Sequence, residues 1–141
     1  MFKHIVAPVD LLHLDSLERA LSVTAEMARL LGAKVTFVSV TIAGPSRIAS
    51  GPDDFRAKLQ HLVDGLNVKY DMSAAAHPVF SNDPTVDVDD ALLHVIEELK
   101  ADLVIMASHK PGFADYFWPS NGGRVASHSD VSVFLVRDET A

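Results

Sequence analysis

The feature that most constrains the fold of this chain is a repeated alternation of short apolar runs with longer segments of helical periodicity. Between the first two runs, apolar or small residues recur at spacings of three, four and seven, which places one stripe on a helix. A helix between consecutive strands lets the strands run parallel, and right-handed crossovers put helices on both faces of the sheet. The alternation predicts an α/β fold with a five-stranded, mostly parallel sheet, whose strands are expected at 5–9, 35–40, 74–80, 103–106 and 131–136.

Local signals predict where individual elements begin and end. Asp15, followed by Glu18 three residues later, predicts a capping box at the start of the first helix, and Gly32 predicts its end. Pro78 interrupts the third apolar run and cannot donate a ladder hydrogen bond, so this run is expected to be an edge strand or to contain a bulge. Further helices are expected around residues 55–66 and 88–99, and a short one is expected to open near residue 120.

Composition limits the classes of function. The 141 residues carry no long low-complexity tract, so one domain spanning 1–141 is expected. Lys and Arg number 12 against 19 Asp and Glu, a net charge of −7, which argues against broad nucleic-acid or anionic-membrane binding. There is no cysteine, and no apolar run approaches the roughly 20 residues that cross a bilayer. Because the opening residues also lack a secretory signal, we expect a cytoplasmic protein without membrane insertion.

In open parallel sheets, ligands bind beyond the carboxyl ends of the strands, where the strand order reverses. Asp10 follows the first strand and could accept hydrogen bonds from ribose hydroxyls or an adenine amine, or could serve the turn itself. His109 and Lys110 follow the fourth strand and offer donors or positive charge to an anion. Ser120 to Gly123 could either cap a helix or present its backbone N–H groups to phosphate.

Other chemistries lack their motifs. Neither of the standard glycine-rich phosphate loops is present, and the seven histidines are scattered without zinc-ligand spacing. No G-x-S-x-G elbow supports a serine hydrolase. The aromatic run 116–118 could stack on a base or pack as a loop anchor.

Taken together, these segments resemble the universal stress protein family over essentially the whole chain. The resemblance is carried by Ile5-Val6-Ala7-Pro8-Val9-Asp10, Val38-Ser39-Val40, Asn82-Asp83-Pro84, Met106-Ala107-Ser108-His109, Ser120-Asn121 and Val133-Phe134-Leu135-Val136-Arg137. It implies a flavodoxin-like three-layer sandwich, similar to the adenine-nucleotide alpha-hydrolase fold, with strand order 3-2-1-4-5.

The same resemblance implies that the ligand is ATP, bound with or without Mg²⁺. Adenosine would lie against the ends of the first two strands, the ribose beside the fourth strand, and the triphosphate against the later loop and helix start. The implied binding residues are Pro8, Val9, Asp10, Val40, Met106, Ala107, His109, Lys110, Ser120, Asn121 and Gly122. Ala107, Lys110 and Pro119 stand where ATP-binding members have glycines, and Pro119 removes one backbone N–H there.

The pattern favours a stress-response sensor or regulator over a fast enzyme, because no acidic pair for two-metal chemistry and no arginine finger is recognisable. Two alternatives stay open: a slow ATPase using His109 and Lys110, and a nucleotide-free module that binds partners through Tyr116, Phe117 and Trp118. We also expect an unidentified regulatory protein partner, and a homodimer formed through the apolar strand Val131–Arg137.

Overall fold

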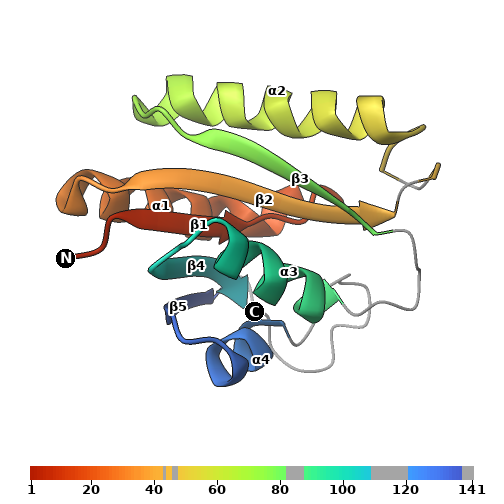
Figure 1. The fold of residues 1–141 in the computed structure, drawn as a ribbon. Coiled ribbons are helices and arrows are strands. Elements are labelled where there is room, and N and C mark those ends of the chain that lie inside the picture. The colour runs from red at the N-terminus through yellow and green to blue at the C-terminus, as the bar shows by residue number, and fades with distance from the viewer. Residues whose placement is uncertain (43, 46–47, 82–87, 109–120, 138–141) are drawn as a thin grey trace.

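The computed structural model describes residues 1–42, 44–45, 48–81, 88–108 and 121–137. Five strands form one sheet in the order β3-β2-β1-β4-β5, with helices on both faces (Figure 1). Every neighbouring pair is parallel, so the expected α/β fold and strand order are confirmed, and the sheet is wholly rather than mostly parallel. The elements are β1 (His4–Pro8), α1 (Glu18–Leu31), β2 (Lys34–Ile42), α2 (Pro52–Tyr70), β3 (Ala75–Ser81), α3 (Val88–Glu98), β4 (Leu103–Ser108), α4 (Asn121–His128) and β5 (Ser132–Arg137).

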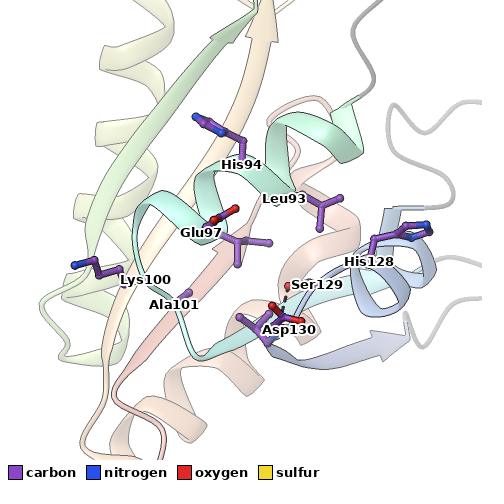
Figure 2. A pocket seen from close by; sticks show the side chains of 10 residues that line it. Leu93, His94, Glu97, Lys100, Ala101, His128, Ser129 and Asp130 are labelled. Atoms are coloured by element: carbon purple, nitrogen blue, oxygen red, sulfur yellow. Dashed lines mark hydrogen bonds between the residues drawn. The ribbon is translucent and has the colours of Figure 1, made fainter.

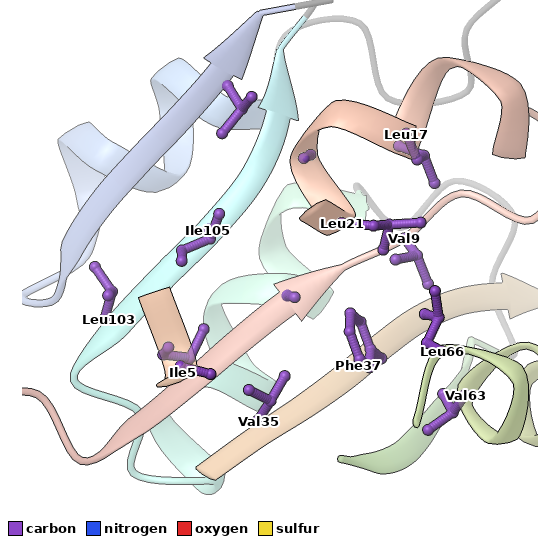
Figure 3. Packing of buried hydrophobic residues seen from close by; sticks show 14 of the residues in the cluster. Ile5, Val9, Leu17, Leu21, Val35, Phe37, Val63, Leu66, Leu103 and Ile105 are labelled. Carbon is purple, nitrogen blue, oxygen red and sulfur yellow. The ribbon is translucent and has the colours of Figure 1, made fainter. Parts of the chain in front are cut away.

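One face of the sheet packs against α1 and α2. Alternate strand residues point to this face, and Phe37 lies at its centre with no exposed surface (Figure 3). Leu21 of α1 and Val63 of α2 approach the same layer from the helix side. Burial of this layer is a main source of stability, because apolar area removed from water contributes about 25 cal/mol per Å².

The opposite face packs against α3 and α4. Val6, Val38 and Val104 point to this side, one position out of step with the residues of the first face. Leu92 of α3 and Val125 of α4 are both fully buried against them. The strands are therefore apolar on both sides, which is why their sequences are continuous apolar runs rather than alternating ones.

The start of the first helix differs from expectation. Leu14–Leu17 form a 3₁₀ helix, and α1 begins only at Glu18, where no side chain caps its backbone. The predicted capping box at Asp15 and Glu18 is therefore wrong, because Asp15 lies inside the 3₁₀ turn instead of ahead of the helix. Gly32 ends α1 as predicted: its φ is 62°, and its N–H bonds to the carbonyl of Ala28.

The third strand has the edge position that its proline predicts. β3 pairs with β2 alone, and the register runs without a break from Ala75 to Ser81, so Pro78 sits in an edge strand without a bulge. The fourth strand continues to Ser108, two residues beyond the expected end, because Ala107 and Ser108 pair in register with Val136 and Arg137. Among the described residues, no helix is both long and apolar enough to cross a bilayer.

His4 is buried at the beginning of β1. It lies at the end of the sheet opposite the carboxyl ends of the strands. Its Nδ1 lies 3.1 Å from the carbonyl oxygen of Leu99 and its Nε2 lies 2.8 Å from Thr36 Oγ1. A carbonyl only accepts, so Nδ1 carries the proton of the neutral ring and Nε2 accepts from the hydroxyl. Burial and then the nearby Lys34 charge lower the pKa of His4, and the Leu99 carbonyl and Asp102 oppose them only in part.

We expect the protein to lose stability as pH falls below about 6.5, the pKa of histidine in an unfolded chain. Because the pKa of His4 is lowered by folding, the unfolded chain binds the proton first, and the loss continues until the folded-state pKa is passed. Urea unfolding between pH 8 and 5 would measure it. The non-titrating variant His4→Gln should lose less stability over this range than the unmodified protein, and equal losses would contradict the prediction.

Candidate functional site

The strand order creates a topological switch between β1 and β4. The connection from β1 leads to β2 on one side, whereas the connection from β4 leads to β5 on the other. The ladder between β1 and β4 joins only Ile5 to Leu103 and Val6 to Val104. Beyond this point the two strands are no longer paired, and their carboxyl ends frame the place where such sheets bind ligands.

Three of the predicted residues, Pro8, Val9 and Asp10, follow one another at the end of β1. The N–H of Val9 donates to the carbonyl of Val38 at 2.8 Å, and the hydroxyl of Ser39 donates to the carbonyl of Val9 at 2.7 Å. Val9 is only 1% exposed. The end of β1 is thus held firmly against β2, which fixes the position of Asp10.

Asp10 is 7% exposed and organises the loop that follows it. Its Oδ1 accepts from the N–H of Leu12 at 2.9 Å, and its Oδ2 lies 2.9 Å from Nδ1 of His13. The turn role that the sequence left open is therefore present. It leaves room for a ligand, because an ionised carboxylate offers about four acceptor positions.

His13 is a residue that sequence reasoning missed. It lies three residues after Asp10, its side chain is 24% exposed, and its carbonyl accepts from both the N–H and the hydroxyl of Ser16. The Asp-x-x-His spacing after a strand was the available signal. Both side chains of this pair belong to the carboxyl edge of the sheet.

The backbone of Val40 faces the same opening, at the carboxyl ends of the strands. In a parallel strand, the N–H and C=O groups of successive residues point alternately to the two neighbouring strands. The carbonyl of Val38 faces β1, so the backbone groups of Val40, two residues later, also face the β1 side. The register between β1 and β2 ends at Pro8 and Val38. The peptide groups of Val40 therefore face the space beyond the end of β1, while its side chain is buried in the core beneath α3.

Met106 and Ala107 lie in β4, in register with Leu135 and Val136. Met106 is 3% exposed and packs into the core, so its side chain contributes to stability rather than to an open binding surface. Ala107 is partly buried on the other face. Both residues therefore lie within β4 itself, close to its carboxyl end, and not in a loop.

The start of α4 is the remaining part of the predicted site within the described residues. The helix begins at Asn121, close to the expected position, and no acidic residue lies in its first turn. His109, Lys110, Pro119 and Ser120 lie outside the described residues, as does the aromatic run 116–118. For Asn121 and Gly122 the structure describes the helical backbone only.

Arg124 of α4 forms ion pairs that the sequence did not reveal. Its Nη2 lies 2.9 Å from Oδ1 of Asp90, and its Nε lies 3.8 Å from Oδ2 of Asp89. Both carboxylates lie in the first turn of α3, and Asp89 is buried. The pairs join two helices whose contacting residues are more than 30 positions apart, so no local spacing could have indicated them.

A hollow of about 530 Å³ lies elsewhere, between the last turns of α3 and α4 (Figure 2). Lys100 and Ala101 precede β4 and Val131 precedes β5, so this hollow belongs to the amino ends of the strands. Its rim mixes opposite charges, Glu97 and Asp130 with Lys100. None of the predicted binding residues lines it, and an anionic nucleotide would meet two carboxylates there.

The described residues hold no group of three or more metal-ligating side chains. Asp10 nevertheless supplies a carboxylate at the carboxyl edge, and Mg²⁺ is commonly held by one or two carboxylates together with nucleotide phosphates. Within the described part of the chain, the donor set is thus compatible with a phosphate-borne Mg²⁺ and supplies no dedicated protein cage.

Comparison with known proteins agrees with this architecture. A model of the universal stress protein family matches residues 1–137. A universal stress protein from Archaeoglobus fulgidus is 20% identical, with 96% of this chain and 98% of that chain covered and a TM-score of 0.70.

Two further solved structures are described as nucleotide complexes. A universal stress protein in complex with cAMP is 22% identical, covers 96% of this chain and 97% of its own, and has a TM-score of 0.68. The A. fulgidus protein in complex with dAMP is 20% identical, covers 95% and 97%, and has a TM-score of 0.68. At these identities the likeness establishes the shared fold.

Proposed function

Because this chain belongs to the universal stress protein family, we propose that it binds an adenine nucleotide, with ATP as the preferred ligand, and acts as a sensor or regulator. The observation that carries the proposal is the parting of β1 and β4 beyond Val6 and Val104, with Asp10 at the end of one strand and α4 starting after the other. The cAMP and dAMP complexes of structurally similar proteins support the adenine part of the ligand.

Adenosine would be held mainly by backbone groups and one carboxylate. The peptide groups of Val40 would meet the base, because they face the space beyond β1. Asp10 would accept from ribose hydroxyls or the exocyclic amine, using the acceptor capacity left beside Leu12 and His13. Pro8 lacks an N–H and so cannot donate to β4, beyond the point where the β1–β4 register ends at Val6 and Val104.

The phosphates would meet the start of α4. Unpaired N–H groups and the helix dipole favour an anion at such an end, and no carboxylate of α4 itself competes there. Lys110, His109 and Ser120 would complete this half of the site, as the family resemblance implies. Mg²⁺ would be carried by the phosphates and neutralise part of their charge. We place this function in the cytoplasm, where a regulatory protein partner would respond to the ligand state.

Titration calorimetry and thermal unfolding test the proposal. We expect heat on titration with ATP, ADP and AMP, and a rise in unfolding temperature that increases with ligand concentration, because a ligand that binds only the folded state stabilises it. GTP at equal concentration is the control for nonspecific phosphate binding. Absence of both signals for all three adenine nucleotides would overturn the proposal.

We further propose that two copies associate through β5. This strand forms one edge of the sheet, and Phe134 and Leu135 are 40% and 38% exposed on it. An exposed apolar edge strand is a template for pairing with another chain.

Light scattering is therefore expected to give about twice the 15.3 kDa mass of one chain at micromolar concentration. Leu135→Lys should shift the protein to the monomer by placing a charge on the edge. Leu30→Lys, at a 78% exposed position on α1, is the matched control and should leave the mass unchanged. A monomer in the unmodified protein would contradict the prediction.

A further inference from the structure

The connection between α3 and β4, residues 99–102, is held to the beginning of β1 by His4. The Nδ1–H of His4 donates to the carbonyl of Leu99 at 3.1 Å, and the carbonyl of His4 accepts from the N–H of Asp102 at 3.1 Å. The carboxylate of Asp102 accepts from the N–H groups of Lys3 and His4, at 2.8 and 2.9 Å. Of these four hydrogen bonds, His4 takes part in three.

The connection has a backbone conformation that needs support from outside it. Lys100 has a φ of 55°, in the left-handed region that residues with a Cβ rarely adopt. The N–H of Lys100 bonds to the carbonyl of Glu97 and the N–H of Ala101 to that of Ile96, which is the Schellman pattern that usually has glycine at the left-handed position. A lysine there costs free energy, so the contacts that hold the connection closed must offset this cost.

The ladder between β1 and β4 adds little to this attachment. It joins two residue pairs, Ile5 with Leu103 and Val6 with Val104, whereas β1 and β2 are paired at five positions. The contacts of His4 therefore reinforce the most weakly paired junction of the sheet. Breaking them would act on this junction before it acts on the rest of the fold.

The arrangement around the His4 ring suits its neutral form. The residue is 7% exposed, and its Nε2 accepts from the hydroxyl of Thr36 at 2.8 Å. Two charged side chains act on the ring, Lys34 from β2 and Asp102 from the connection, while α3 contributes the carbonyl of Leu99. Burial and then Lys34 lower the pKa of His4, and the carbonyl and Asp102 offset them only in part.

The carboxylate of Asp102 does not change its charge when His4 titrates. Burial raises the pKa of Asp102, but the hydrogen bonds from the N–H groups of His4 and Lys3 outweigh it and lower this pKa on balance. Asp102 therefore stays ionised near neutral and mildly acidic pH. His4 is the group of this cluster that gains a proton there.

We infer that His4 is a pH-sensitive contact, which releases the connection between α3 and β4 when its ring is protonated. The closed arrangement favours the neutral ring, so a proton favours an open arrangement in which the ring reaches water and leaves the carbonyl of Leu99. Lys100 and Ala101 line the hollow between the last turns of α3 and α4 (Figure 2), so release changes one wall of that hollow. The inference is independent of the proposed nucleotide site.

Amide hydrogen exchange, followed by NMR, tests the inference. In the open arrangement the ring has the pKa of a solvated histidine, about 6.5. Between pH 7.5 and 5.5 the open population should therefore rise by up to about tenfold, and the protection factors of the Ala101 and Asp102 amides should fall by the same factor. Low urea concentrations should leave these protection factors unchanged, because a local opening exposes little surface.

The connection between α2 and β3 is an internal control of the same form. Asp71 has a φ of 52°, and the N–H of Met72 bonds to the carbonyl of Asn67. The side chain of Asn67 closes this connection through two hydrogen bonds with the backbone of Ala74. Its local opening leaves His4 buried, so the protection factor of the Met72 amide should be the same at both pH values.

Two variants identify the titrating group. His4→Gln removes the ionisable ring and should abolish the pH dependence at Ala101 and Asp102, whatever the protection factors themselves become. His94→Gln is the matched control, because His94 lies on α3 with its side chain 81% exposed and paired with Glu98. This variant should keep the full pH dependence of the unmodified protein.

Three results would overturn the inference. Constant protection factors at Ala101 and Asp102 in the unmodified protein would show that the connection stays closed around a protonated ring. A fall that carries the urea dependence of global unfolding would show that His4 acts on overall stability alone. NMR titration of the His4 ring needs no variant, and a pKa at or above about 6.5 would mean that a proton favours the closed arrangement.

Discussion

Leu59→Ala is expected to lower the free energy of unfolding by about 2–5 kcal/mol. Leu59 lies in α2 with no exposed surface and packs in the layer between the sheet and the two helices on that face. Alanine removes buried methyl groups and leaves a cavity that close-packed neighbours fill only in part. Because domains of this size are stable by only about 5–15 kcal/mol, the loss would be a large fraction of the total.

Leu30→Ala provides the matched control. The same residue type is removed from a helix, but Leu30 is 78% exposed on α1. The expected change is within about 0.5 kcal/mol. Urea unfolding of the two variants measures both effects, and a similar destabilisation in each would show that the layer around Leu59 is not packed as described.

Most of the fold followed from hydrophobic periodicity. Residues 103–106 and 131–136 were expected as strands, and β4 and β5 contain almost all of them. The periodicity places Leu62 on the apolar stripe of α2, together with Phe55, Leu59 and Leu66. The structure buries Val63 completely and leaves Leu62 partly buried, a choice that depends on the angle at which the helix crosses the sheet.

The strand-end rule predicted the location of the candidate site, because it depends on topology alone. It led to Asp10 and to the start of α4. The strand-end rule could not predict the ion pairs of Arg124, because Asp89 and Arg124 become neighbours only when α3 and α4 pack on the same face of the sheet. The missed 3₁₀ turn lies in a local setting that the periodicity did not reveal: Asp10 contacts His13 in the loop after β1, and the 3₁₀ helix begins at the next residue, so Asp15 lies inside it.

The prediction with the largest expected effect on ligand binding concerns Asp10. Asp10→Ala should weaken binding of ATP and AMP alike by about 10- to 100-fold, because a hydrogen bond to a charged group contributes about 1.5–3 kcal/mol. Both ligands share the adenosine that Asp10 would hold, so the ratio of their affinities should stay constant. Titration calorimetry at one pH and one salt concentration measures both.

Asp10 also organises its own loop, and the control must separate this role from ligand binding. Asp10→Asn keeps an oxygen that can accept from the N–H of Leu12, but it removes the charge. We expect near-normal thermal stability for this variant together with most of the loss in affinity. His13→Ala removes the partner of Oδ2 and leaves the carboxylate in place, so its affinity loss should be the smaller one.

The three variants distinguish the two roles of the carboxylate. If Asp10→Asn binds nucleotide as well as the unmodified protein does, the carboxylate serves only the turn, and adenosine is held by backbone groups. If Asp10→Asn loses affinity at unchanged stability, the negative charge itself meets the ligand. The second result is the one expected, because the firm attachment of Val9 to β2 places Asp10 at the opening between β1 and β4 before any ligand arrives.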